Sequence, residues 1–244
     1  MLLNDTNDFL KTFHILTYEN SKWQAWRDFI FMSSCSLSNA LAKNDYKNRE
    51  AEYLKTINKY SKRDQQLFPK LFAKLVMALE HNPEQDFLGT VFMELGLNSH
   101  HNGQFFTPYN VCQLMSDMTL YGLENEIEQR GYFAINDPAC GAGATLIASA
   151  NVSKNILQKV GKNFQNYGLF TGQDIDMTVG LMCYLQLSLL GCAGYVKIGN
   201  TLTDPMRDND DITKYWFTPM YFSDIWKIRR MLGQINTIFK RGEE

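Results

Sequence analysis

Apolar residues recur every three or four positions through most of the first hundred residues, a spacing that predicts helices. A first series and a stricter second one show it: Trp23, Trp26, Ile30, Leu37, Leu41; then Leu67, Phe68, Leu71, Phe72, Leu75, Val76, Leu79. Asn82 and Pro83 predict the end of one helix and the cap of the next. That next helix stops at Gly96 and carries on one face Phe87, Leu88, Val91, Phe92 and Leu95.

Residues 41–66, which separate the two series, mix acidic and basic side chains. This mixture favours a solvated helical face over a nucleic-acid patch.

The pattern changes after residue 100. Thr107 and Pro108 resemble an N-cap and a first helical residue. Strand-like runs follow at 132–137, 167–175 and 194–200, with helical segments between them. Helices that alternate with strands predict a parallel sheet and an α/β fold. A weaker fourth run at 211–222 precedes an amphipathic basic helix over 223–244. We therefore predict an N-terminal helical domain (1–100) and an α/β domain (101–244).

Composition and charge exclude several classes of protein. The chain has 244 residues, 45% hydrophobic content and a net charge of −2. Such a chain can fill a core but has no overall attraction for phosphate. Five cysteines without CxxC spacing argue against disulfides and a zinc site. No signal peptide or membrane span is apparent, so we expect a cytoplasmic protein.

The stretch NDPACGAGATL (136–146) joins a predicted strand to a helix. Gly141 and Gly143 permit positive φ and a close ligand approach at the carboxyl end of the strand. A dinucleotide fingerprint does not fit, because Leu146 stands where a small residue is needed, and no phosphate-binding Gly-Lys-Ser/Thr follows. A tight turn that needs only small residues would give the same pattern.

The two following strands end in polar residues. Asp174 ends the second strand, where an acid can accept both ribose hydroxyls of an adenosyl ligand. Asn200 follows the third strand and offers an amide for an adenine amine. A glycine turn, an acid and an amide at consecutive strand ends predict a nucleoside pocket.

These residues resemble the N-6 adenine DNA methylase family, specifically the modification subunits of type I restriction-modification systems. DPACGAGATL resembles its first motif, GQFFTPYNVCQLM the preceding one, and GQDID and GNTL the next two. Together they cover about residues 85–202. The resemblance implies a Rossmann-like methyltransferase core and S-adenosylmethionine as cofactor.

The resemblance also assigns roles. Phe106, Thr107 and Pro108 would border the methionine end of the cofactor. Its methionine and sugar would be lined by Asp137, Cys140, Gly141 and Gly143. Asp174 would hold the ribose and Asn200 the adenine, where the family usually has aspartate. No metal is implied.

The sequence departs from the family pattern in two places. The family handles the flipped target base with Asn/Asp-Pro-Pro-Tyr/Phe, which is absent here. By position, its degenerate counterpart is Thr218-Pro219-Met220-Tyr221, with Thr218, Pro219 and Tyr221 as candidate catalytic residues. The later strands and the DNA-recognition segment of the family also have no counterpart, so the shortened sheet has an open edge for the last helix or a protein partner to cover.

Three functions remain open. The first is an adenine-specific DNA methyltransferase that acts on double-stranded DNA with a specificity or other subunit. The second is a catalytically lapsed relative that binds S-adenosylmethionine in regulation or assembly. The third is an interaction protein that keeps only the fold. The retained glycines and acids speak against the third, and the missing catalytic motif makes activity of the isolated chain doubtful.

Overall fold

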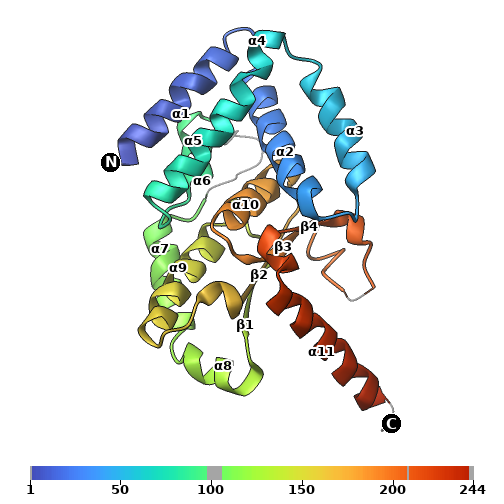
Figure 1. The fold of residues 1–244 in the computed structure, drawn as a ribbon. Helices are drawn as coiled ribbons and strands as arrows, with labels where there is room; N and C mark the ends of the chain where they lie inside the picture. The colour runs from blue at the N-terminus through green and yellow to red at the C-terminus, as the bar shows by residue number, and fades with distance from the viewer. Residues whose placement is uncertain (1, 98–105, 208, 242–244) are drawn as a thin grey trace.

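The computed structural model describes residues 2–97, 106–207 and 209–241, without the side chains of residues 2–3 and 233–241. Figure 1 shows the elements in chain order. The helices are α1 (Leu2–Leu16), α2 (Lys22–Leu41), α3 (Tyr46–Ile57), α4 (Lys62–Gln65), α5 (Leu67–His81), α6 (Phe87–Glu94), α7 (Tyr109–Thr119), α8 (Leu123–Arg130), α9 (Ala144–Lys159), α10 (Met177–Leu189) and α11 (Asp224–Arg241). The strands are β1 (Phe133–Asp137), β2 (Gly168–Asp174), β3 (Ala193–Ile198) and β4 (Tyr215–Phe217).

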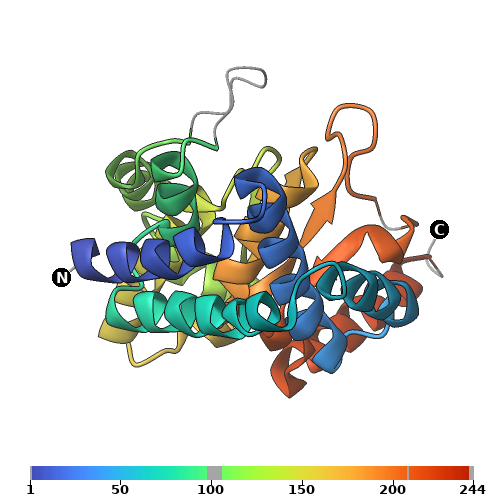
Figure 2. The ribbon, with the colours of Figure 1, turned by 90° about the horizontal axis from the view of Figure 1, so that it is seen from above.

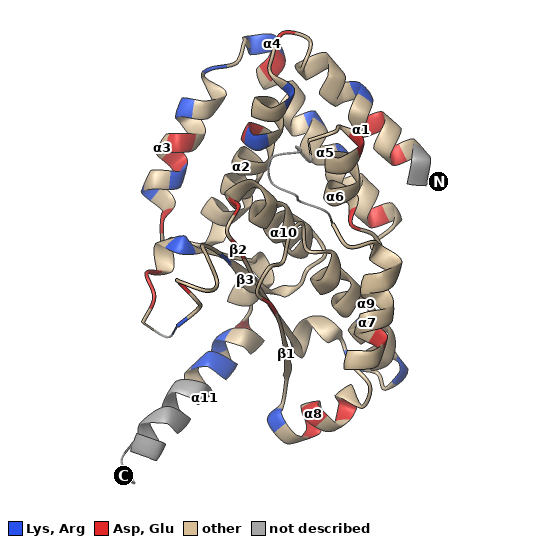
Figure 3. Cartoon of the chain, turned by 180° about the vertical axis from the view of Figure 1, so that it is seen from behind, with Lys and Arg blue, Asp and Glu red and all other residues tan. Residues whose placement is uncertain are grey.

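Helices α2, α5 and α6 pack on α10, which in turn lies against the sheet, and α1, α3 and α4 pack on the outer side of these helices (Figure 1). α1 and α5 lie side by side, as the view from above shows (Figure 2). Most of the apolar positions predicted to face inward are buried, among them Trp26, Ile30 and Leu71, but Trp23 and Leu41 at the ends of the first series are exposed. α10 carries no charged residue and is buried along most of its length, whereas α3 displays both signs of charge (Figure 3). The helical prediction for this part of the chain is confirmed.

Two local predictions in this region are wrong. α5 ends before Asn82 as expected, but the N-cap of α6 is Asp86, whose carboxylate accepts a hydrogen bond of 2.8 Å from the Gly89 amide. The turn at 82–85 therefore intervenes between the two helices. Within the charged stretch, Arg49 is not on a solvated face, since only 3% of it is exposed.

The described strands form one sheet in the order β1-β2-β3-β4. β1, β2 and β3 are parallel, as predicted, and α9 and α10 pack on the same face of them. β4 runs antiparallel to β3, with Tyr195 opposite Phe217 and Lys197 opposite Tyr215. The physical reason is the connection, since a parallel return needs a crossover, usually a helix, and the described residues between β3 and β4 contain only one short 3-10 turn.

The sheet has two edges with different surroundings. At the β4 edge, Asn44 and Arg49 donate hydrogen bonds of 3.1 and 2.9 Å to the Tyr215 carbonyl. The N-terminal helices therefore cover this edge. At the β1 edge, Ala134 and Asn136 are exposed. The edge that remains open to further pairing is thus formed by β1, not by the fourth strand.

One cluster of buried side chains runs from Phe9 and Trp26 through Phe92 to Leu146 and Tyr184. The N-terminal helices and the sheet therefore share a core. The predicted domain boundary near residue 100 lies outside the described residues. In the described part of the chain, none of the helices is both long and apolar enough to cross a membrane.

Arg49 supplies a test of the contact between the N-terminal helices and the sheet. Its guanidinium lies 3.8 Å from the Trp216 ring centroid and also donates to Ser38 Oγ at 2.6 Å. Arg49→Leu removes these contacts and the bond to Tyr215, so we expect the free energy of unfolding to fall by about 2–4 kcal/mol. Urea denaturation measures it, with Arg63→Leu on exposed α4 as the control, expected within about 0.5 kcal/mol of the parent protein. Equal losses in both variants would contradict this role.

Candidate functional site

The carboxyl ends of the three parallel strands bring the predicted polar residues to one edge of the sheet. Asp137 is the last residue of β1, Asp174 is the last residue of β2, and Asn200 follows β3 by two residues. Because the strands pair in parallel register, these three positions lie next to one another. We call them, with the turn at 138–143, the carboxyl edge.

The glycine turn between β1 and α9 is braced by the end of β2. Gly141 and Gly143 have φ of +55° and +97°, values that L side chains rarely adopt. The Gly141 amide donates a hydrogen bond of 2.9 Å to one oxygen of Asp174, and the Asp176 amide donates one of 2.9 Å to the other. Burial raises the pKa of Asp174, an effect that these two amide donors partly offset. The carboxylate is therefore fixed in place at the edge.

Asp137 braces the same turn from the other side. Its Oδ1 accepts from the Ala139 amide at 3.1 Å, and its Oδ2 accepts from the Thr145 hydroxyl at 2.6 Å. Gly143 is the N-cap of α9, so the first amides of that helix face this region. The turn thus has the donors and the small residues that a polar ligand needs for close approach.

The side chain of Cys140 belongs to the core. A Cβ added at Gly172 would lie 3.0 Å from the Cys140 Sγ, and the Cys140 amide donates to the Gln173 carbonyl at 3.0 Å. A hydrogen bond to Cys140 and burial raise the pKa of the neighbouring Cys183 thiol. Only the main chain of Cys140 is therefore available to the carboxyl edge.

Phe106 lies directly over the glycine turn. Among the described residues, two carbons of the Phe106 ring are the only atoms within 4 Å of the place that a Gly141 Cβ would take, both at 3.4 Å. The ring centroid lies 5.6 Å from that of Phe92. Thr107 and Pro108 follow as exposed residues. Pro108, not Thr107, is the N-cap of α7, so the predicted capping role of Thr107 is wrong.

Asn200 uses its side-chain oxygen within its own turn. That oxygen accepts from the Leu202 and Thr203 amides at 2.9 and 3.4 Å. The Thr201 hydroxyl donates to the Pro138 carbonyl, which joins the loop after β3 to the turn after β1. The carboxamide NH₂ of Asn200 has no hydrogen-bond partner among the described residues.

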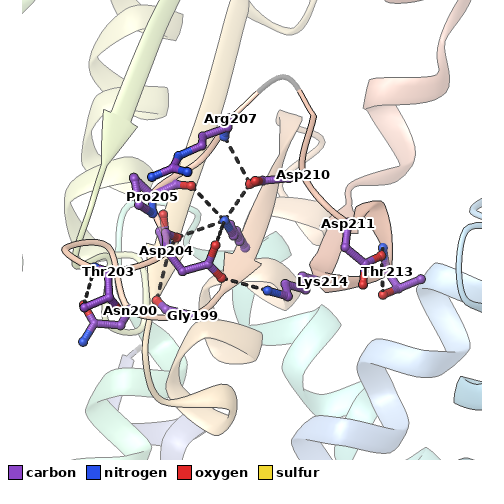
Figure 4. A network of polar contacts seen from close by, with 12 residues as sticks. Gly199, Asn200, Thr203, Asp204, Pro205, Arg207, Asp210, Asp211, Thr213 and Lys214 are labelled. Carbon is purple, nitrogen blue, oxygen red and sulfur yellow. Dashed lines mark hydrogen bonds and ion pairs between the residues drawn. The ribbon is translucent and has the colours of Figure 1, made fainter.

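A buried lysine holds the rest of this loop (Figure 4). Lys197 is 0% exposed. Its ammonium donates to both the carbonyl and the carboxylate of Asp204 at 2.9 and 3.0 Å, and to Asp210 at 2.6 Å. Gln173, also buried, donates to the carbonyls of Gly199 and Asp204 at 3.2 and 2.8 Å. Two side chains from the strands thereby fix the loop that begins at Asn200.

The structure does not bring Thr218, Pro219 and Tyr221 to the carboxyl edge. Because β4 is antiparallel, its last residues lie beside the amino end of β3. The Thr218 hydroxyl is buried, donates to the Cys192 carbonyl at 2.7 Å and accepts from the Gly194 amide at 2.9 Å. Pro219 and Tyr221 continue into a short 3-10 turn (Pro219–Phe222). These residues and the glycine turn therefore lie at opposite ends of the strands.

Comparison with known families identifies the family to which the chain belongs. A family model described as N-6 DNA methylase matches residues 86–240, more than half of the chain, including all the strands and the whole carboxyl edge. The chain belongs to the N-6 DNA methylase family. Its family function is methylation of DNA, which supports the first of the three functions considered from sequence.

Sequence reasoning missed the polar residues that support the carboxyl edge of this family member. Gln186 of α10 donates to the Ala142 carbonyl at 2.9 Å and to Asp86 at 2.8 Å, which ties the glycine turn to α6. Lys197, Gln173 and Gln186 each stand in a strand or helix whose residues are mostly apolar or small. A polar residue at such a position is the signal that could have revealed them, because burial requires a partner.

Lys197 and Lys214 form a matched pair for testing the loop that follows β3. Both bind Asp204, but Lys197 is buried, whereas the Lys214 side chain is 46% exposed. We expect Lys197→Met to lower the free energy of unfolding by about 3–5 kcal/mol, because it leaves buried acceptors and Asp210 without their cation. Lys214→Met should change it by less than about 1 kcal/mol. Urea denaturation of the two variants measures the difference, and equal values would refute the clamping role of Lys197.

Proposed function

We propose that the carboxyl edge binds S-adenosylmethionine, as the Rossmann-like methyltransferase core that the sequence resembles would. The observation that carries the proposal is the fixed Asp174 carboxylate beside a glycine turn with positive φ. A half-buried acid with free lone pairs is suited to the ribose hydroxyls, and the turn leaves room for the rest of the ligand. The Phe106 ring covers Gly141 at ordinary van der Waals distance, so it forms one wall of the proposed site beside the turn.

The proposed roles follow the positions of the residues. Asp174 takes the ribose. Phe106, Thr107 and Pro108 border the methionine, together with Asp137 and the main chain of residues 140–143. Asn200 takes the adenine through its carboxamide NH₂, because its oxygen is engaged by the turn. S-adenosylmethionine supplies an electrophilic methyl group when bound, and the residues of this chain orient it.

For the acceptor we propose adenine in double-stranded DNA, with the chain acting as a modification subunit beside a specificity or other subunit. The exposed β1 edge is where such a partner adds to the sheet. We propose that the chain acts in the cytoplasm, where it would meet its DNA substrate.

A second function is favoured by a specific observation. The Thr218 hydroxyl is consumed by backbone groups at the amino end of β3, so the segment 218–221 has no group aimed at an amine beside the cofactor. A chain that binds S-adenosylmethionine without transferring its methyl group would serve regulation or assembly. Both functions use the same cofactor site. They differ in whether a partner subunit supplies the residues that bind the target adenine.

Cofactor binding is tested by calorimetry with S-adenosylmethionine. We expect Asp174→Ala to weaken binding by about 1–3 kcal/mol, the scale of a lost hydrogen bond to a charged group. Asp176→Ala removes a neighbouring carboxylate that caps α10 and serves as the matched control, expected to leave the affinity within about twofold. An Asp174→Ala affinity equal to that of the parent protein would rule out the ribose role.

Methyl transfer separates the two functions. Incubation of the chain with labelled S-adenosylmethionine and adenine-containing duplex DNA should leave the DNA unlabelled, because no described residue at the carboxyl edge replaces the missing catalytic motif. Label in DNA from the chain alone would overturn this expectation. The positive control is a complete adenine methyltransferase under the same conditions.

A further inference from the structure

The far face of the sheet, opposite α9 and α10, carries a strip of aromatic rings. Val196 faces α10, where an added Cβ at Gly180 would lie 3.7 Å from it, so its neighbour Tyr195 faces the other way. The ring centroid of Tyr195 lies 5.7 Å from that of Phe217 and 5.7 Å from that of Tyr221. Phe217 and Tyr221 are stacked at 5.0 Å, and Tyr215 stacks on Phe217 at 6.0 Å. We call these four residues the aromatic strip.

Two hollows flank the aromatic strip, and Tyr195 and Tyr221 line both of them. The first, of about 540 Å³, lies between the strip and the start of α11 and is also lined by Tyr132 and Trp226. The second, of about 390 Å³, lies toward the loop that follows Asn200 and is also lined by Met206. The rings therefore form a shared wall between two open spaces, each large enough for a planar group.

Arginines border both hollows. Arg130, Arg229 and Arg230 line the first, and Arg207 lines the second. No described carboxylate lies within ion-pair distance of Arg207, Arg229 or Arg230, whereas Arg130 pairs with Glu126 at 2.9 Å. The second hollow is also lined by Asp210, which pairs with Lys197 at 2.6 Å, whereas no carboxylate is among the described residues that line the first hollow, so the excess of positive charge is larger there.

Two of these arginines are held rigidly. Arg230 lies 4.1 Å from the Tyr221 ring centroid and donates to the Tyr221 carbonyl at 2.6 Å. Arg229 lies 4.8 Å from the Trp226 ring centroid and donates to the Gly131 carbonyl at 2.9 Å. Each guanidinium has five N–H donors, so donors remain for an anion after these bonds.

Aromatic walls next to fixed cations are what unpaired nucleotides require, because bases stack on rings and phosphates pair with guanidinium groups. A base in an intact duplex is stacked on its neighbours and does not enter a hollow between side chains. We propose that the aromatic strip and its arginines bind a single-stranded nucleic-acid segment, with bases in the two hollows and phosphates at Arg130, Arg207, Arg229 and Arg230. This surface is separate from the carboxyl edge and needs no cofactor.

The proposal is tested by fluorescence anisotropy with the full chain and a labelled 12-nucleotide single strand of DNA. The variant combines Arg130→Gln and Arg207→Gln, because both residues are exposed and neither holds α11. The control combines Arg27→Gln and Arg63→Gln, which removes the same charge from exposed positions on the N-terminal helices. We expect the Kd of the first variant to rise about tenfold, the slope of log K against log salt to shrink by about 1–2, and the control to match the parent protein.

Further probes test the chemistry of the ligand. The same sequence as a duplex, and a strand of abasic sites, should each bind at least about tenfold more weakly than the intact strand. Deoxyadenosine monophosphate should compete only weakly, because it occupies one hollow. Equal binding of duplex and single strand, equal binding of the abasic strand, or a Kd unchanged in the Arg130 and Arg207 variant would each overturn the proposal. If the chain did not bind S-adenosylmethionine, that result would contradict the cofactor site proposed at the carboxyl edge. It would not change the result expected for single-stranded DNA.

Discussion

The hydrogen bond from the Gly141 amide to the Asp174 carboxylate is the constraint on which the carboxyl edge depends. It joins the turn after β1 to the last residue of β2, and the same carboxylate also accepts from Asp176 at the start of the next turn. One side chain therefore sets the exit of the chain toward both α9 and α10. A ligand that binds this acid finds it already ordered, so less conformational entropy is lost on binding than at a mobile side chain.

The N-terminal helices take part in this constraint. Gln186 reaches from α10 to the Ala142 carbonyl and to Asp86, the N-cap of α6. All of these groups are buried, and burial raises the pKa of Asp86 while its bonds to Gln186 and Gly89 oppose the shift. Removing α6 and its N-cap would leave Gln186 without Asp86 and without the Leu88 amide, and of its described bonds only the one to Ala142 would remain, so the helices and the turn form one structural unit. At the β4 edge of the sheet, Arg49 likewise ties α3 to the Tyr215 carbonyl of β4.

Sequence patterns predicted what depends on local periodicity. The alternating and apolar runs predicted β1, β2 and β3 within a residue or two, and the positive φ of Gly141 and Gly143 followed from the absence of a Cβ. They could not predict the direction of β4, because that depends on whether the loop after β3 crosses the sheet. The position of Thr218 depended on that direction, so the catalytic alignment was not accessible from spacing alone. Burial of Arg49 and Lys197 likewise arises from contacts between residues distant in sequence, where local charge patterns are uninformative.

The antiparallel direction of β4 also separates the carboxyl edge from the aromatic strip. It carries the chain from the carboxyl edge to the amino ends of the strands, where Trp226 donates to the Gln165 carbonyl at 2.8 Å and anchors α11 on the far face. The glycine turn and the aromatic strip consequently lie on different sides of one rigid sheet. The loop after β3 borders both surfaces, since it begins with Asn200 at the carboxyl edge and its Met206, Arg207 and Asp210 line the second hollow. Lys197 binds both Asp204 and Asp210, so it ties the part of the loop near the carboxyl edge to the part that lines the second hollow.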